Sequence, residues 1–91
     1  MTTRLHLQIY GQVQGVSFRW YAQQRAQSLG LAGWMRNRPD GSVEAMVQGP
    51  DEVVQQFVTW ARQGPSAASV ERVTVEHEEP REDEQGFHVA R

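Results

Sequence analysis

The segment GQVQGVSFR, residues 11–19, combines residue types that can bind an anion. Gly11 and Gly15 can adopt backbone angles closed to other residues, so nearby main-chain N–H groups can turn toward one point. A helical pattern begins at Phe18, and a helix N-terminus leaves N–H groups without partners at the positive end of the helix dipole. Arg19 adds a guanidinium fork that matches phosphate. The expected phosphate cradle consists of the amides of Gln14, Gly15, Val16, Ser17 and Phe18 together with Arg19.

The same segment also fits a plain connection between a strand and a helix. In that interpretation the glycines only turn the chain, Ser17 caps the helix and Arg19 forms a surface ion pair. A loop that contains glycine and precedes a helix does not by itself decide between the two interpretations.

The elements that would position this loop follow from the hydrophobic pattern. Alternation predicts strands over residues 5–9, 43–47 and 70–75, the last with an irregularity in phase that fits a bulge. Helical spacing predicts helices over residues 18–29 and 50–63, and residues 31–49 form a hairpin with a turn at 39–41. Residues 87–89 form a short extra C-terminal strand. This order predicts an α+β ferredoxin-like sandwich (βαββαβ), with an antiparallel sheet and two helices on one face.

Asn37 lies at the end of the first arm of that hairpin. Period-2 alternation places it on the same face as Met35 and opposite Arg36 and Arg38. A polar residue here is also explained by hydrogen bonding to the following turn. The two arginines fit a positive rim or a solvated face.

Composition excludes several kinds of chemistry. The chain has no cysteine, which rules out disulfides, thiolate metal sites and a cysteine nucleophile. It also has no lysine, so a Walker-type phosphate loop and Schiff-base chemistry are excluded. The histidines lie in different predicted strands without metal-ligand spacing, and we expect no metal and no cofactor. These residues are His6, His77 and His88.

Length and charge set further limits. Residues 1–91 fit a single domain, and no segment is apolar enough for a signal peptide or membrane helix, so we expect a cytoplasmic protein. The net charge is −2, but residues 76–84 hold six acidic side chains and one arginine, which leaves +3 on the rest. We expect that acidic stretch to be a solvated turn, and the acidic whole argues against nucleic acid as a partner.

Two segments together resemble the signatures of the acylphosphatase family: GQVQGVSFR, residues 11–19, and GWMRNRPDGSVE, residues 33–44. The resemblance extends to the order of elements and to GPDEVVQQF, residues 49–57, and so covers almost the full chain. Two long signatures at the right separation are highly specific. Met35 stands where valine is commoner in the family, a mild change in the core that leaves the site intact.

The resemblance implies metal-independent hydrolysis of a small acyl phosphate to a carboxylate and inorganic phosphate. It implies that Arg19 binds the substrate phosphate and that Asn37 positions the attacking water. The leaving carboxylate, whose conjugate acid has a pKa of about 4 to 5, needs no proton to depart. We expect a monomer. The alternative is a non-catalytic anion-binding or regulatory module of the same fold.

Overall fold

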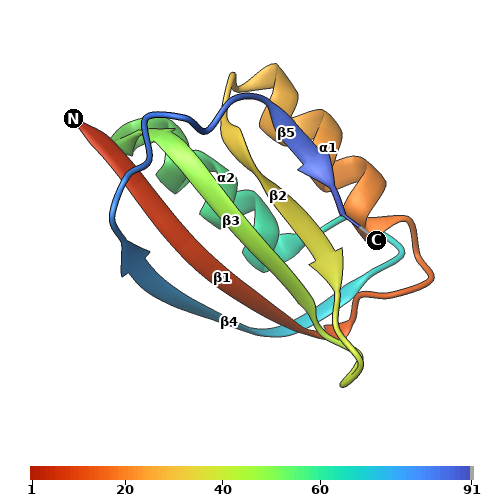
Figure 1. Cartoon of the computed structure of the whole chain (residues 1–91). Helices are drawn as coiled ribbons and strands as arrows, with labels where there is room; N and C mark the ends of the chain where they lie inside the picture. Colours follow the sequence, from red (N-terminus) through yellow and green to blue (C-terminus); the bar gives the residue numbers. More distant parts are fainter. Residues whose placement is uncertain (91) are drawn as a thin grey trace.

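Five strands form one sheet, and two helices cover one of its faces (Figure 1). The computed structural model describes residues 1–90. The order across the sheet is β4-β1-β3-β2-β5. This arrangement confirms the expected ferredoxin-like fold with its extra C-terminal strand. Along the chain the elements are β1 (Thr2–Gln12), α1 (Phe18–Ser28), β2 (Ala32–Asn37), β3 (Val43–Pro50), α2 (Asp51–Gln63), β4 (Ser69–Glu78) and β5 (Phe87–Val89).

The predicted antiparallel sheet is correct for β1 to β4 and wrong at the C-terminal edge. β1 pairs antiparallel with β3 and β4, and β2 pairs antiparallel with β3. β5 pairs parallel with β2, so the sheet is mixed. The expected bulge is confirmed, because the register between β1 and β4 shifts between Tyr10 and Gly11.

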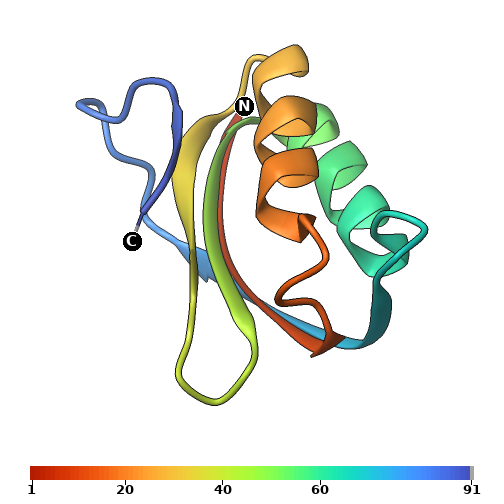
Figure 2. The ribbon, with the colours of Figure 1, turned by 90° about the vertical axis from the view of Figure 1, so that its right-hand side faces the viewer.

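The core lies between the helices and the sheet, as Figure 2 shows edge-on. The alternating residues of β1 and β3 are at most 1% exposed on this face, and α1 and α2 cover them. The predicted period-2 and helical patterns therefore meet in one hydrophobic core. Its fully buried members include Leu5, Leu7, Ile9, Val43, Ala45, Val47, Phe18, Ala22, Val54 and Phe57. Neither helix in residues 1–90 is long and apolar enough to span a bilayer.

Strand directions bring three chain segments to one end of the sheet. β1 and β2 both run antiparallel to β3, so their C-terminal ends point the same way. β5 is parallel to β2 and also ends there. The loop into α1, the β2–β3 hairpin and the end of β5 therefore meet near one another (Figures 1 and 2).

The acidic stretch is only partly the solvated turn that we expected, because residues 76–78 belong to β4. Most of its side chains are exposed, but Glu84 lies 2.7 Å from Arg4, which is only 5% exposed. Gln48 also holds the stretch, because its amide donates to the Arg81 carbonyl and accepts from the Arg81 N–H. These contacts attach the segment between β4 and β5 to the sheet face that the helices leave open (Figure 2).

Candidate active site

The loop between β1 and α1 contains two left-handed residues, Gly15 with φ +76° and Ser17 with φ +60°. Ser17 is the only non-glycine residue with positive φ in residues 1–90. Such a conformation is uncommon and often marks a functional segment. A Cβ added at Gly15 would meet nothing within 4 Å, so backbone conformation rather than crowding favours glycine there. Loops that combine left- and right-handed residues can present a concave set of N–H groups to an anion.

The main-chain N–H groups of this loop are available for a ligand. From Gly15 to Arg19, none donates a hydrogen bond to another atom of residues 1–90. The first hydrogen bond of α1 instead joins the Tyr21 N–H to the Ser17 carbonyl, at 3.1 Å. The N-terminal N–H groups of α1 therefore keep the partial positive charge that favours a bound anion.

The alternative in which Ser17 caps α1 through its side chain is wrong. Ser17 occupies the N-cap position but makes no side-chain capping hydrogen bond. A capping serine has an extended backbone that places its oxygen near the N–H groups of the first turn, and the left-handed backbone of Ser17 does not. The N-terminus of α1 therefore has no side-chain cap from Ser17.

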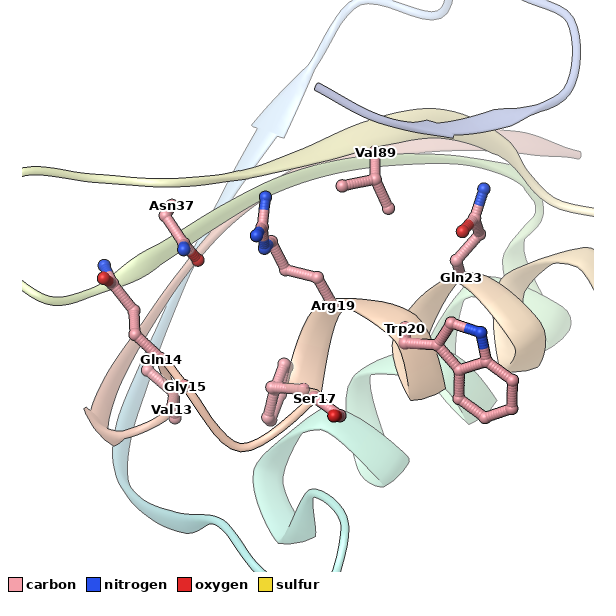
Figure 3. A pocket seen from close by; sticks show the side chains of 10 residues that line it. Val13, Gln14, Gly15, Ser17, Arg19, Trp20, Gln23, Asn37 and Val89 are labelled. Atoms are coloured by element: carbon pink, nitrogen blue, oxygen red, sulfur yellow. The ribbon is translucent and has the colours of Figure 1, made fainter. Parts of the chain in front are cut away.

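Arg19 lies in the first turn of α1 and is half-buried. Its Nη1 approaches the Ala90 carbonyl oxygen at 3.5 Å, at the end of β5. Within residues 1–90 no carboxylate forms a salt bridge with Arg19, which gives the alternative of a surface ion pair no support there. In Figure 3 its guanidinium extends toward the sheet, between Asn37 and Val89.

Asn37 is the last residue of β2 and faces the same side as the buried Met35. Arg36 and Arg38 face the opposite side, as expected from the alternation. They do not form a free positive rim, because both pair with Glu44, at 2.6 and 3.8 Å respectively. Asn37 is therefore the hairpin residue whose side chain reaches the loop side of the sheet (Figure 3).

The predicted residues meet in a cavity of about 420 Å³ between the loop, α1, β2 and β5. Gln14, Gly15, Ser17, Phe18, Arg19 and Asn37 all line it (Figure 3). Val16 does not line the cavity; its side chain packs against the core. Phe18 is only 1% exposed, so its ring also belongs to the core, and its main-chain N–H is the group that it offers.

The cavity is positive and lacks ionisable acids. None of its ten lining residues among residues 1–90 is acidic or a histidine, and Arg19 is the only charged one. The described residues contain no group of three His, Asp or Glu side chains that could hold a metal ion. The cavity therefore offers hydrogen-bond donors, one guanidinium and neutral amides, which suits an oxyanion.

Sequence reasoning missed some residues of the cavity. Gln23 and Val89 line it beside Arg19, and Trp20 stands at its edge, 56% exposed. Gln23 follows Arg19 by four residues and so shares its helix face, a spacing that could have indicated it. The position of Val89 depends on the parallel pairing of β5, which no local pattern indicates.

A family model named Acylphosphatase matches residues 5–89, which is nearly the whole chain and includes all the residues expected to form the site. The chain belongs to the acylphosphatase family. Its membership agrees with the resemblance seen in the two signature segments. The chain is therefore an enzyme that hydrolyses acyl phosphates, rather than a non-catalytic module of the same fold.

Individual relatives support the same family. A protein named acylphosphatase from Thermococcus kodakarensis is 54% identical over 94% of this chain and 93% of its own length. One from Thiobacillus denitrificans is 59% identical over 82% of this chain and 84% of its own. Among solved structures, the acylphosphatase from Bacillus subtilis superposes with a TM-score of 0.93 at 33% identity, and all of both chains is covered.

Proposed function

We propose that this chain hydrolyses small acyl phosphates without a metal ion, with the loop amides and Arg19 holding the phosphoryl group and Asn37 positioning water. The observation that carries this assignment is that Arg19, Asn37 and a loop with unpaired N–H groups line one cavity. The amides involved are those of Gln14, Gly15, Val16, Ser17 and Phe18.

Phosphoryl transfer needs positioning and charge stabilisation more than covalent help from the protein. Its transition state is loose and spreads negative charge over the three equatorial phosphoryl oxygens. N–H groups fixed at a helix start and a guanidinium can hold those oxygens without reorganising during the reaction. Arg19 can donate two parallel hydrogen bonds, whereas each amide donates one. This set of donors matches the charge that develops.

The leaving group explains why the cavity needs no general acid. The departing carboxylate is the conjugate base of an acid with a pKa of about 4 to 5, so it leaves unprotonated at neutral pH. The donor set in the cavity contains no carboxylic acid or imidazole among the described residues. The site is thus suited to acyl phosphates rather than to phosphate esters, whose alkoxide leaving groups require protonation.

Asn37 suits the attacking water because its side chain both accepts and donates a hydrogen bond. It is neutral and so cannot serve as a strong base. In this mechanism the water oxygen attacks phosphorus, the bond to the carboxylate oxygen breaks, and a phosphoryl oxygen takes the proton that the water loses. The products are a carboxylate and inorganic phosphate.

The proposed partner is a small molecule rather than a nucleic acid, and the proposed form is a cytoplasmic monomer without a cofactor. The net charge of −2 opposes binding to a polyanion. A small, dianionic ligand still fits the local positive charge around Arg19.

The proposal is tested with benzoyl phosphate in the presence of EDTA. The wild-type chain should hydrolyse it well above the uncatalysed rate. Asn37→Ala should lower kcat by about 10² to 10³-fold, because water loses its orientation. The inhibition constant of inorganic phosphate should change by less than about threefold, because the cradle is intact. An equal loss of turnover and phosphate affinity would contradict the water role, and loss of all activity with EDTA would contradict metal independence.

A further inference from the structure

The proposed phosphate cradle uses only the main-chain N–H of Gln14. Its side chain is free for another role, and it makes two hydrogen bonds. Its Nε2 donates to the Arg38 carbonyl oxygen at 2.8 Å and to the Ser42 carbonyl oxygen at 2.9 Å. Both distances are those of good N–H···O hydrogen bonds. One amide group thus uses both of its donors on the hairpin between β2 and β3.

The two accepting carbonyls flank Asn37 in the hairpin. Arg38 follows Asn37 directly, and Ser42 precedes Val43, the residue that pairs with Asn37 across the ladder. Each carbonyl also accepts a hydrogen bond from the hairpin, the Arg38 carbonyl from the Gly41 N–H and the Ser42 carbonyl from the Arg38 N–H. Gln14 therefore attaches to both arms at the point where the hairpin leaves the sheet.

Hydrogen bonds within the hairpin turn join Asp40 to Ser42. Asp40 accepts hydrogen bonds from the main chain and hydroxyl of Ser42, which is 1% exposed. The hydrogen bonds from Ser42 also hold the pKa of the Asp40 carboxyl below its usual value. The hairpin turn is thus held by its own hydrogen bonds, and Gln14 links it to the loop.

We propose that Gln14 is a positioning residue, whose side chain fixes the distance and orientation of Asn37 relative to the phosphate-binding loop. The inference rests on the proposed function, because it assigns Gln14 a role through the water that Asn37 orients. Gln14 stands next to Gly15 in the loop, and its side chain lies at the Asn37 side of the same cavity (Figure 3). A misplacement of about 1 Å between reacting groups can cost about 10²-fold in rate.

The test removes the two donors and keeps the apolar part of the side chain. Gln14→Leu should lower kcat for benzoyl phosphate by about 10- to 100-fold. The inhibition constant of inorganic phosphate should stay within about threefold, because the loop N–H groups and Arg19 remain. Gln14→Met keeps the length of the side chain and serves as the second variant if the leucine variant does not fold. An unchanged kcat, or an equal loss of kcat and phosphate affinity, would overturn the inference.

Gln27→Leu is the matched control. Gln27 also donates from its side-chain amide to a main-chain carbonyl, that of Phe87 at 3.3 Å, but this contact joins α1 to β5 and does not touch the hairpin. Its kcat should stay within about twofold of wild type. A loss as large as that of Gln14→Leu would mean that any loosening around the cavity slows turnover, which would overturn the specific role of Gln14.

A double-mutant cycle with Asn37→Ala separates the inference from the proposed function. If Gln14 acts through Asn37, the double variant should be about as slow as Asn37→Ala alone, within about threefold. If the two losses multiply, Gln14 acts independently of Asn37 and the inference fails while the water role stands. If Asn37→Ala alone keeps full turnover, the proposed function fails and the inference falls with it.

Discussion

The arginine side chains at the two faces of the sheet have different partners. On the open face, Arg4 lies 2.7 Å from Glu84, and Arg36 lies 2.6 Å from Glu44. On the face with the cavity, Arg19 meets only the Ala90 carbonyl, at 3.5 Å, among the described residues. The same residue type is thus paired with carboxylates in one region and left open to a ligand in the other.

The other hydrogen-bonding groups also differ between the two regions: within the described residues they are paired on the open face, whereas main-chain N–H groups near the cavity are unpaired. On the open face, His6 and Glu44 approach within 2.6 Å, and Gln48 bonds both to Arg4 and to Arg81. Near the cavity, the N–H groups of residues 15–19 have no acceptor within residues 1–90. Gly15 and Ser17 are exposed, so these N–H groups can bind water or a ligand, whereas buried donors such as those of Arg4 are paired within the protein. This cluster of unpaired donors beside a single guanidinium supports the proposed anion site, whereas the paired groups on the open face serve the fold.

The largest expected difference between the two regions is in catalysis. Arg19→Ala should lower kcat/KM by about 10³-fold, because the guanidinium is lost from the charge-stabilising donors. Arg36→Ala is the matched control, since Arg36 lies in β2 next to Asn37 but faces the open side. It should keep kcat/KM within about threefold. Steady-state kinetics with benzoyl phosphate measures both, and comparable losses would remove the functional distinction between the two faces.

For the free energy of unfolding we expect the opposite order, with a larger loss from a substitution on the open face than from one at the cavity. Arg4 is 5% exposed, and Arg4→Ala leaves Glu84 without its partner. The free energy of unfolding should fall by about 2 to 3 kcal/mol, less than for a fully buried pair because the Glu84 side chain is 20% exposed. Arg19→Ala should change it by less than about 1 kcal/mol. Urea unfolding followed by circular dichroism measures these values.

Arg72→Ala provides the matched control for that measurement. Arg72 is exposed and stacks over the ring of Tyr10, with 4.4 Å to the ring centroid, on the same open face. An exposed contact of this kind contributes about 0.5 to 1 kcal/mol. If Arg4→Ala lowered the free energy of unfolding no more than Arg72→Ala does, the burial of the Arg4–Glu84 pair would add nothing to stability.

Local patterns made most of the fold predictable. The alternation around Leu5 and Val43 and the helical spacing from Phe18 gave the correct elements, because each pattern reflects one face buried against the same core. The parallel pairing of β5 was not predictable in this way. Three residues, Phe87–Val89, carry too little pattern to choose a neighbour, and the choice depends on the loop that Glu84 and Arg81 attach to the sheet.

The residues that line the cavity were predictable where they belong to contiguous sequence, and not where tertiary contacts bring them together. Glycines before a helix start and an arginine in its first turn fit an anion site and a plain connection equally well, and the family resemblance decided between the two and added the role of Asn37. The side-chain contacts of Gln14 join residues 24 and 28 positions apart, so no local spacing indicates them. Likewise, the pairing of Arg36 and Arg38 with Glu44 required the register of β2 against β3.

The smallest expected effect is on the pH dependence of the free energy of unfolding, through the contacts of Glu44 on the open face. Burial alone would raise the pKa of Glu44, but hydrogen bonds from His6 and Arg36 outweigh burial and hold the pKa of this carboxyl below its usual value. A lowered pKa in the folded state means that the stabilisation is complete above the pKa of the unfolded chain and is lost as pH falls through the folded pKa. The groups that face Glu44 are His6 from β1 and Arg36 and Arg38 from the end of β2.

Glu44→Gln should therefore flatten the pH dependence of stability without affecting the reaction. As the pH falls from about 5 to about 3, the free energy of unfolding of the wild type should fall more steeply than that of the variant, so that the two curves converge in acid. Urea titrations at several pH values give both curves, and the difference between them removes the contribution of other carboxylates. Since Glu44 does not line the cavity, kcat at pH 7 should stay within about threefold of wild type. A constant difference in stability across this range would show that Glu44 acts through packing rather than through its charge, and a large loss of kcat would connect the two faces that the structure separates.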